Sequence, residues 1–192
     1  MIAISRTRTT LFTLVTLVLG CVAIFLVRAR SPFPSDSTPE GAYLRIAKSI
    51  GEGDVRSIFP YLETDAQWAA YSIFELRKKA CAIIDAHYPV EARPSAGPFC
   101  QALASSSTAE EWFVVLCHRR DWIKRLQHDL SGVQRVEFQG DSAIVLTVRG
   151  SRYPFRKRDN GMWGITLFTS ELIAEREKAA RDEQLIESTA GN

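Results

Sequence analysis

The sequence lacks the short motifs that mark several common chemistries. It contains no glycine-rich phosphate loop, no H-E-x-x-H, no C-x-x-C and no G-x-S-x-G. Histidine is also scarce, with three residues in 192. These absences argue against the common hydrolase, nucleotide-binding and zinc functions. We therefore expect no cofactor, no metal site and a non-catalytic role.

Extremes of composition are missing as well. Hydrophobic residues make up 46% of the chain and charged residues 24%, which is ordinary for a globular protein. This composition excludes a disordered, collagen-like or multi-span membrane protein. The length allows one domain with a substantial core and a short appendage, but not two full domains.

Charge is absent from one long stretch near the amino terminus. The nineteen residues from Thr9 to Val27 carry none, and a helix of that length covers about 28 Å, close to the roughly 30 Å hydrocarbon core of a bilayer. We therefore expect residues 1–30 to form a transmembrane anchor. Its apolar residues are Leu11, Phe12, Leu14, Val15, Leu17, Val18, Leu19, Val22, Ile24, Phe25, Leu26 and Val27.

Two alternatives stay open for this segment. A cleaved signal peptide would have a shorter apolar run and a small-x-small cleavage site, whereas this run continues well past Gly20. A lipoprotein signal is suggested by Val18-Leu19-Gly20-Cys21, although apolar residues rather than a polar tether follow the cysteine. The apolar length favours the uncleaved anchor.

The positive charge of the chain comes from this end. Arg6, Arg8, Arg28 and Arg30 flank the apolar run, and residues 31–192 carry 20 basic and 22 acidic groups. A short tail before the span is typical of a signal-anchor whose long domain lies outside the cytoplasm. We expect a single-pass bacterial inner-membrane protein with the lipid bilayer as a partner, and no nucleic-acid binding, because the domain is slightly acidic.

The rest of the chain predicts one α+β domain over residues 39–187, after a Pro/Ser-rich tether at 31–38 and before a frayed tail at 188–192. Apolar periodicity, capping residues and breakers predict the helices. The expected helices cover 39–50, 55–59, 65–88, 109–130 and 171–187, with a helical turn near 100–104 in an otherwise irregular 89–107.

Particular residues carry these helix predictions. Thr38 should cap the first helix, Gly51 should end it, and Ser170 should cap the last. In the 65–88 helix the pattern places His87 on the buried stripe and Arg77, Lys78 and Lys79 outside it. Thr108 and Glu111 form a capping box before the 109–130 helix.

After Gly132 the apolar period changes from 3.6 to 2, which is typical of strands. Four strands separated by the turns Gln139-Gly140-Asp141, Gly150-Ser151 and Asp159-Asn160-Gly161 predict an antiparallel meander. The fold class is therefore α+β: an N-terminal transmembrane helix, then helices, a four-stranded antiparallel meander and a C-terminal helix.

One segment resembles a known family. The run Thr38-Pro-Glu-Gly-Ala-Tyr, Ile50-Gly-Glu-Gly-Asp-Val and Ile58-Phe-Pro-Tyr-Leu62 is similar to the opening of the nuclear transport factor 2-like superfamily, whose bacterial members often follow a leader. The late curved sheet that ends at Trp163-Gly164-Ile165 is also similar to that fold. The resemblance implies a cone-shaped α+β domain and assigns no functional residue. The segment 149–164 is similar to proteins of predatory or social soil bacteria.

Three groups of residues are candidates for function. Arg149, Arg152, Arg156, Lys157 and Arg158 form the one concentrated basic patch, which would bind an anionic ligand or simply be a solvated strand face. Cys81, Cys100 and Cys117 allow one disulfide, most naturally from Cys100 to one of the two long helices, or else three small buried side chains. We expect the histidines, including His118 and His128, to be structural.

Two functions remain in competition. The first is an extracytoplasmic binding or interaction domain without catalytic activity, with a protein partner or an anionic ligand. The second is a small-molecule-binding domain or enzyme whose pocket lies between the curved sheet and the helices. Trp112, Tyr153 and Trp163 are the candidate lining residues of such a pocket.

Overall fold

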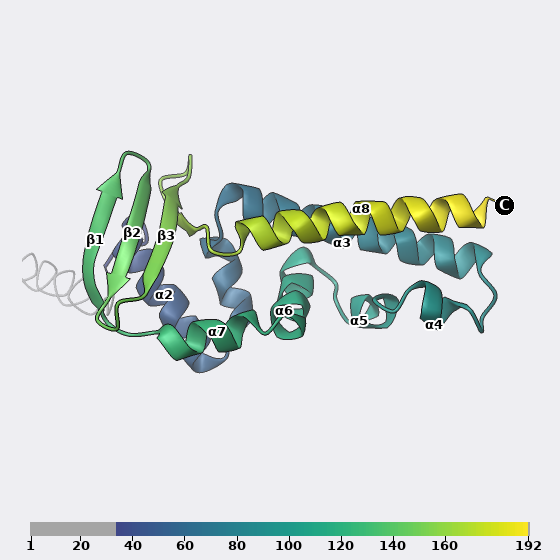
Figure 1. Cartoon of the computed structure of the whole chain (residues 1–192), viewed down its shortest axis with the longest axis horizontal. Coiled ribbons are helices and arrows are strands. Elements are labelled where there is room, and N and C mark those ends of the chain that lie inside the picture. Colours follow the sequence, from purple (N-terminus) through teal and green to yellow (C-terminus); the bar gives the residue numbers. More distant parts are fainter. Residues whose placement is uncertain (1–33, 192) are drawn as a thin grey trace, which may run out of the picture. The chain divides into compact units, whose positions relative to one another are not determined.

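The computed structural model describes residues 34–191. The predicted anchor over residues 1–30 and the first residues of the tether lie outside the described residues. From Ser35 onward the chain forms one unit of α+β structure with a four-stranded antiparallel sheet and a C-terminal helix (Figure 1). Within residues 34–191, no helix is both long enough and apolar enough to cross a membrane.

The unit begins with α2 (Pro39–Glu52) and a 3₁₀ helix, η1 (Val55–Tyr61). As predicted, Thr38 caps α2: its hydroxyl accepts a hydrogen bond from the amide of Gly41. The predicted stop at Gly51 is wrong by two residues. The helix ends at Gly53, which adopts the left-handed conformation (φ 76°) and donates its N–H to Ile50.

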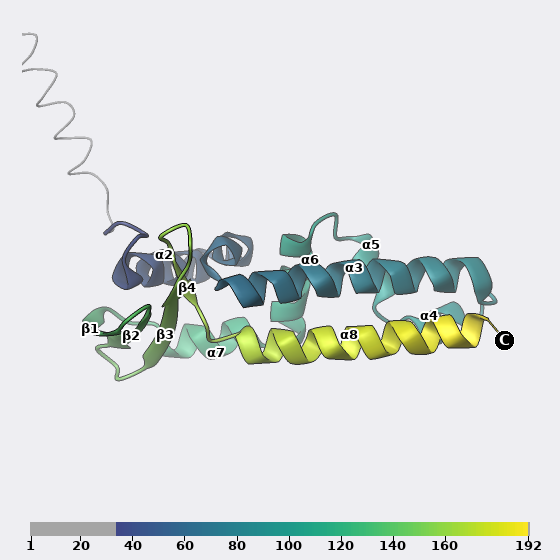
Figure 2. The same ribbon diagram turned by 90° about the horizontal axis from the view of Figure 1, so that it is seen from above.

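The longest helix, α3 (Thr64–His87), matches its predicted range within one residue. Its buried face differs from the prediction, because Arg77 is only 3% exposed and His87 is exposed. Arg77 is buried because of tertiary packing. The C-terminal helix α8 (Thr169–Ala190) runs alongside α3 (Figure 2). Carboxylates of α8 cover Arg77.

The region 89–130 is more broken than predicted. It holds α4 (Arg93–Ala96), in a stretch predicted to be irregular, then α5 (Cys100–Ala104), α6 (Ala109–Arg119) and α7 (Trp122–Asp129). The single helix expected over 109–130 is wrong, because Asp121 adopts a left-handed conformation (φ 52°) that separates α6 from α7.

The capping box before α6 is confirmed in part. The Thr108 hydroxyl accepts a hydrogen bond from the Glu111 amide at 3.3 Å. The Glu111 carboxylate accepts from the amide of Ser107, one residue before the expected position. Both interactions still satisfy amides at the start of the helix.

The predicted meander is confirmed. Strands β1 (Val133–Gln139), β2 (Ser142–Thr147), β3 (Arg152–Lys157) and β4 (Trp163–Ile165) pair antiparallel in the order β1-β2-β3-β4. Phe138, Ala143 and Phe155 are partners across three neighbouring strands and share one face. That face packs against α2.

A close backbone approach joins the sheet to the start of α3. Leu62 forms a bridge with Ile165 of β4, and the Glu63 amide donates to the Ile165 carbonyl at 3.2 Å. A Cβ atom at Gly164 would lie 2.5 Å from the Glu63 Cα, so only glycine fits there.

The last helix differs from its prediction at both ends. Ser170 does not cap it, because the helix begins at Thr169 without a side-chain cap, and it continues past Glu187 to Ala190. Short side chains lie in the buried faces of α3 and α8, which lets the two helices approach closely. These alanines are Ala66, Ala69, Ala70 and Ala80 of α3 and Ala179 of α8.

Candidate functional site

Two clefts bring together side chains that are distant in the sequence. The first, which we call the sheet cleft, has a volume of about 270 Å³ and lies between β3, α7 and the start of α8. Trp122 and Phe168 stack in its wall with ring centroids 5.2 Å apart. Its lining residues are Trp122, Arg125, Leu126, Asp129, Ser151, Arg152, Tyr153, Leu167, Phe168 and Glu171.

Tyr153 gives the sheet cleft its most distinctive polar group. The side chain is 4% exposed, and its hydroxyl has no hydrogen-bond partner among the described residues. Burial raises the pKa of Tyr153 to about 12, so the phenol keeps its proton at neutral pH. The neighbouring Tyr43, 5.0 Å away between ring centroids, instead donates its hydroxyl to the Ser131 carbonyl at 2.7 Å.

The charges at the rim of the sheet cleft are balanced. Arg125 pairs with Glu171 at 3.0 Å, and Arg152 pairs with Glu137 at 3.0 Å. Asp129 adds a carboxylate to the lining. The cleft therefore offers an aromatic wall, a neutral phenol and no excess of one charge.

The second cleft, the helix cleft, has a volume of about 540 Å³ and lies between α3, α6, α8 and the segment that leads into α5. Its lining residues are Arg77, Ala96, Pro98, Phe99, Trp112, Leu116, Arg119, Arg120, Glu175, Lys178, Asp182, Leu185 and Ile186. Four of these side chains are cationic and two are anionic.

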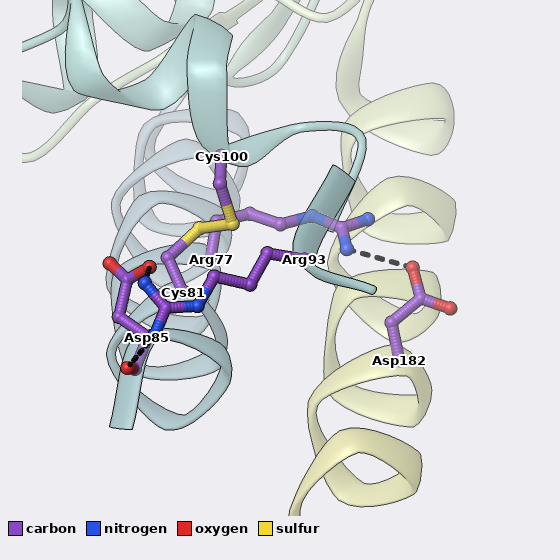
Figure 3. Close-up of a disulfide and its surroundings, with 6 residues drawn as sticks. All are labelled: Arg77, Cys81, Asp85, Arg93, Cys100 and Asp182. Atoms are coloured by element: carbon purple, nitrogen blue, oxygen red, sulfur yellow. Dashed lines mark hydrogen bonds and ion pairs between the residues drawn. A yellow bond between two sulfur atoms is a disulfide. The ribbon is translucent and has the colours of Figure 1, made fainter. Parts of the chain in front are cut away.

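Arg77 is the buried centre of the charged network in the helix cleft. It extends from α3 toward α8, where its Nη1 lies 2.7 Å from the Asp182 carboxylate (Figure 3). Its Nη2 lies 3.6 Å from the Glu175 carboxylate. The Phe99 ring covers the guanidinium: the distance from the guanidinium carbon of Arg77, Cζ, to the ring centroid is 4.1 Å. Glu175 also accepts a hydrogen bond from Arg120. The two carboxylates of the cleft are thus both paired.

Trp112 supplies an unpaired donor beside this network. It is 1% exposed, lines the helix cleft from α6, and its indole N–H has no acceptor among residues 34–191. Arg119 and Lys178 line the same cleft, are exposed, and form no ion pair with another described side chain. A buried N–H without a partner is uncommon and indicates a place for an acceptor.

Most side chains of the predicted basic patch form hydrogen bonds or ion pairs with other residues of the domain. Arg149 donates to the His128 carbonyl, Arg156 lies 3.3 Å from Glu63, and Arg158 donates to the Pro60 carbonyl and to Gln67. Arg152 pairs with Glu137 and is the one member that lines the sheet cleft. The Lys157 side chain has no such contact with the described residues.

The candidate cysteines separate into a pair and a single thiol. Cys81 of α3 and Cys100 of α5 form a disulfide that closes a separation of 19 residues (Figure 3). The same segment is held by Arg93, which donates to the Asp85 and Tyr88 carbonyls at the end of α3. Cys117 is buried, and burial raises the pKa of its thiol well above the ordinary value.

Histidine chemistry is not assembled at either cleft. His87, His118 and His128 are exposed and line neither the sheet cleft nor the helix cleft. Within the described range no group of three His, Cys, Asp or Glu side chains has the arrangement of a metal site.

The residues expected around a single pocket are divided between the two clefts. Tyr153 lines the sheet cleft and Trp112 lines the helix cleft, whereas Trp163 lines neither. Arg77 and Phe168 could not be predicted as site residues, because the local sequence around each of them is typical of something else. An arginine beside two lysines is typical of a solvated helix face, and Phe168 stands in a short connection without periodicity.

The comparisons with known proteins identify no relative. Neither a protein-family model, nor a curated protein, nor a solved structure matches the chain. The similarity of residues 38–62 to the nuclear transport factor 2-like superfamily thus stays a prediction from that motif.

Proposed function

We propose that this chain is a single-pass protein of the bacterial inner membrane whose α+β domain is a non-catalytic binding module outside the cytoplasm. The observation that carries the proposal is the Cys81–Cys100 disulfide. Disulfides persist in oxidising compartments and are rare in the cytoplasm. The uncharged run Thr9–Val27 and the Pro/Ser-rich tether supply the means to hold such a domain at the outer surface of the membrane.

The chemistry of the clefts supports binding over catalysis. General acid–base catalysis needs a group whose pKa lies near the working pH. Tyr153, the one buried phenol in the sheet cleft, has a pKa raised to about 12, and the carboxylates of the helix cleft are held by Arg77 and Arg120. These groups can position a ligand by charge and hydrogen bonds, which is the work of a binding site.

A topology experiment tests the location. Alkaline phosphatase, which is active only outside the cytoplasm, and green fluorescent protein, which matures in the cytoplasm, would each be fused after Asn192 of the full chain. We expect active phosphatase and no fluorescence. We also expect Cys81 and Cys100 to resist alkylation in cells until a reductant is added. A fluorescent fusion with freely alkylated cysteines would overturn the proposal.

A second candidate function rests on the sheet cleft. The unpartnered Tyr153 hydroxyl and the Trp122–Phe168 stack favour a small, flat ligand that carries one hydrogen-bonding group. Thermal shift of the full-length protein across a panel of small aromatic metabolites tests it, with Tyr153→Phe as the matched variant. A hit that is lost in Tyr153→Phe supports this function, and a flat response across the panel rejects it.

A further inference from the structure

We propose that the helix cleft binds a small monocarboxylate with an apolar body, with the carboxylate accepting a hydrogen bond from the Trp112 indole and pairing with Arg119 and Lys178. The inference rests on the proposed function only in assuming that the domain binds a ligand. It adds a site and a ligand class, and it holds for either orientation of the domain at a membrane.

The charge of the cleft selects for an anion. Glu175 and Asp182 are the acidic residues in its lining, and Arg77 and Arg120 pair with them. Arg119 and Lys178 remain as cations without a carboxylate partner among the described side chains. A single negative charge placed between them is attracted by both, whereas a cationic ligand would have to displace an existing ion pair.

The Trp112 indole is the hydrogen-bond donor that we assign to the anion. An indole nitrogen is a donor only, so the group that completes it has to be an acceptor. The N–H has no partner within residues 34–191 and is closed off from solvent, so a ligand in the cleft reaches it only once the side chains around it shift. A hydrogen bond from a neutral donor to a carboxylate is stronger than one to a neutral acceptor, which makes the carboxylate the better match.

The walls of the cleft favour an apolar body on the ligand. Phe99, Leu116 and Ile186 are buried apolar residues of its lining, and Leu185 adds an exposed apolar side chain at the surface. A volume of about 540 Å³ is within the range of small-molecule sites, roughly 300 to 1,000 Å³. The arrangement suits an aryl or short-chain aliphatic carboxylate better than a bare inorganic anion.

Titration of the full-length protein with four named probes tests the ligand class. Benzoate and octanoate are the carboxylates, and benzamide and octan-1-ol are their uncharged counterparts. Binding is measured by isothermal titration calorimetry. The ¹H–¹⁵N indole signals, with Trp112 assigned from the signal that disappears in Trp112→Phe, report the contact itself. We expect at least one carboxylate to bind tenfold or more tightly than its counterpart and to shift the Trp112 signal downfield.

Three variants assign the binding to this cleft. Trp112→Phe removes the donor but keeps an aromatic ring, and we expect it to weaken carboxylate binding about tenfold. Arg119→Gln and Lys178→Gln change exposed residues and should each weaken binding severalfold, so they keep the test informative if Trp112→Phe fails to fold. Arg176→Gln, an exposed arginine of α8 outside the helix cleft, is the matched control and should bind as the wild type does.

The opposite results are equally clear. If neither carboxylate binds more tightly than its uncharged counterpart, or if neither carboxylate binds at all, the ligand class is overturned. Carboxylate binding that is unchanged in Arg119→Gln and Lys178→Gln would overturn the site. Neither result depends on the topology fusions, so this inference and the location of the domain fail separately.

Discussion

Phe155 in the sheet and Arg77 in α3 are both buried, yet their surroundings have little in common. Phe155 belongs to the hydrophobic core that the sheet forms with α2. Arg77 lies between two carboxylates and an aromatic ring, at an interface otherwise rich in alanine. Both the sheet end and the helix end of the domain bury large apolar side chains, but the helix end adds directed polar contacts between α3 and α8 and a disulfide from α3 to α5.

The strand pairings inside the sheet are short in sequence, whereas the polar contacts between α3 and α8 are long. Neighbouring strands of the meander are joined by short turns, and these turns together with the backbone ladders set the strand register. Arg77 and Asp182 are separated by 105 residues. Ion pairs such as this one specify which face of α8 meets α3, which non-directional apolar burial does not do alone.

The largest expected effect is in the sheet end. Phe155→Ala should lower the free energy of unfolding by about 4 kcal/mol, because it leaves a cavity in a packed core. Phe138 lies on the same face of the sheet but is 65% exposed, against 1% for Phe155. Phe138→Ala should therefore cost less than about 1 kcal/mol. Urea denaturation of the full-length variants measures both, and similar losses would contradict the distinction.

The helix end should respond next, through its disulfide. Replacement of Cys81 and Cys100 by alanine removes a crosslink over 19 residues and should lower the free energy of unfolding by about 3 kcal/mol. Dithiothreitol should produce a similar loss in the wild type and none in the double variant. A wild type that reductant leaves unchanged would show that the crosslink adds no stability.

Smaller changes in stability, of opposite sign, are expected at two glycines at the end of α2. Gly53→Ala should destabilise the protein by about 1 kcal/mol, because Gly53 has a φ of 76°. Gly51→Ala should instead stabilise it by roughly 0.5 to 1 kcal/mol, because Gly51 lies within the helix and a Cβ atom there meets nothing within 4 Å. Thermal denaturation should shift the melting temperatures of the two variants in opposite directions. Shifts in the same direction would contradict this account of how α2 ends.

The smallest effect is expected at Tyr153. Tyr153→Phe removes an unpartnered hydroxyl and should change the free energy of unfolding at neutral pH by less than about 0.5 kcal/mol. The pKa of Tyr153 is about 12 in the folded chain and 10 in the unfolded chain. Between pH 10 and 12 the folded chain therefore keeps the phenol proton that the unfolded chain releases, and the free energy of unfolding of the wild type depends on pH.

Wild-type stability should therefore be complete below pH 10 and fall as the pH rises toward 12. Tyr153→Phe should fall less steeply in the same window, and the remaining slope belongs in part to Tyr43, whose pKa is also raised by burial. Urea denaturation at a series of pH values measures this, with tyrosinate absorbance recording the titration. Identical slopes in the two proteins would show that Tyr153 titrates normally.

The same contrast explains what could be predicted from the sequence. The strands and α3 were predictable because period, breakers and turn residues are local signals. The break at Asp121 was not, because an aspartate between Arg120 and Trp122 is compatible with a continuous helix and no local signal marks its left-handed conformation. Arg77 could not be recognised as a cleft residue, since its surroundings depend on α8, which is remote in the chain. Trp112 was predicted to line a pocket, but the pocket was expected against the sheet, whereas Trp112 lines the cleft among the helices.

The pairing of α3 with α8 also has a consequence for the order of events during synthesis. Arg77 leaves the ribosome long before Glu175 and Asp182, its two partners, have been made. Until then the alanine-rich face of α3 has nothing to cover it, and a guanidinium lies within that face. The nascent chain can complete its sheet while this end is still open to chaperones and proteases, and a truncation before Glu175 would leave Arg77 without either carboxylate.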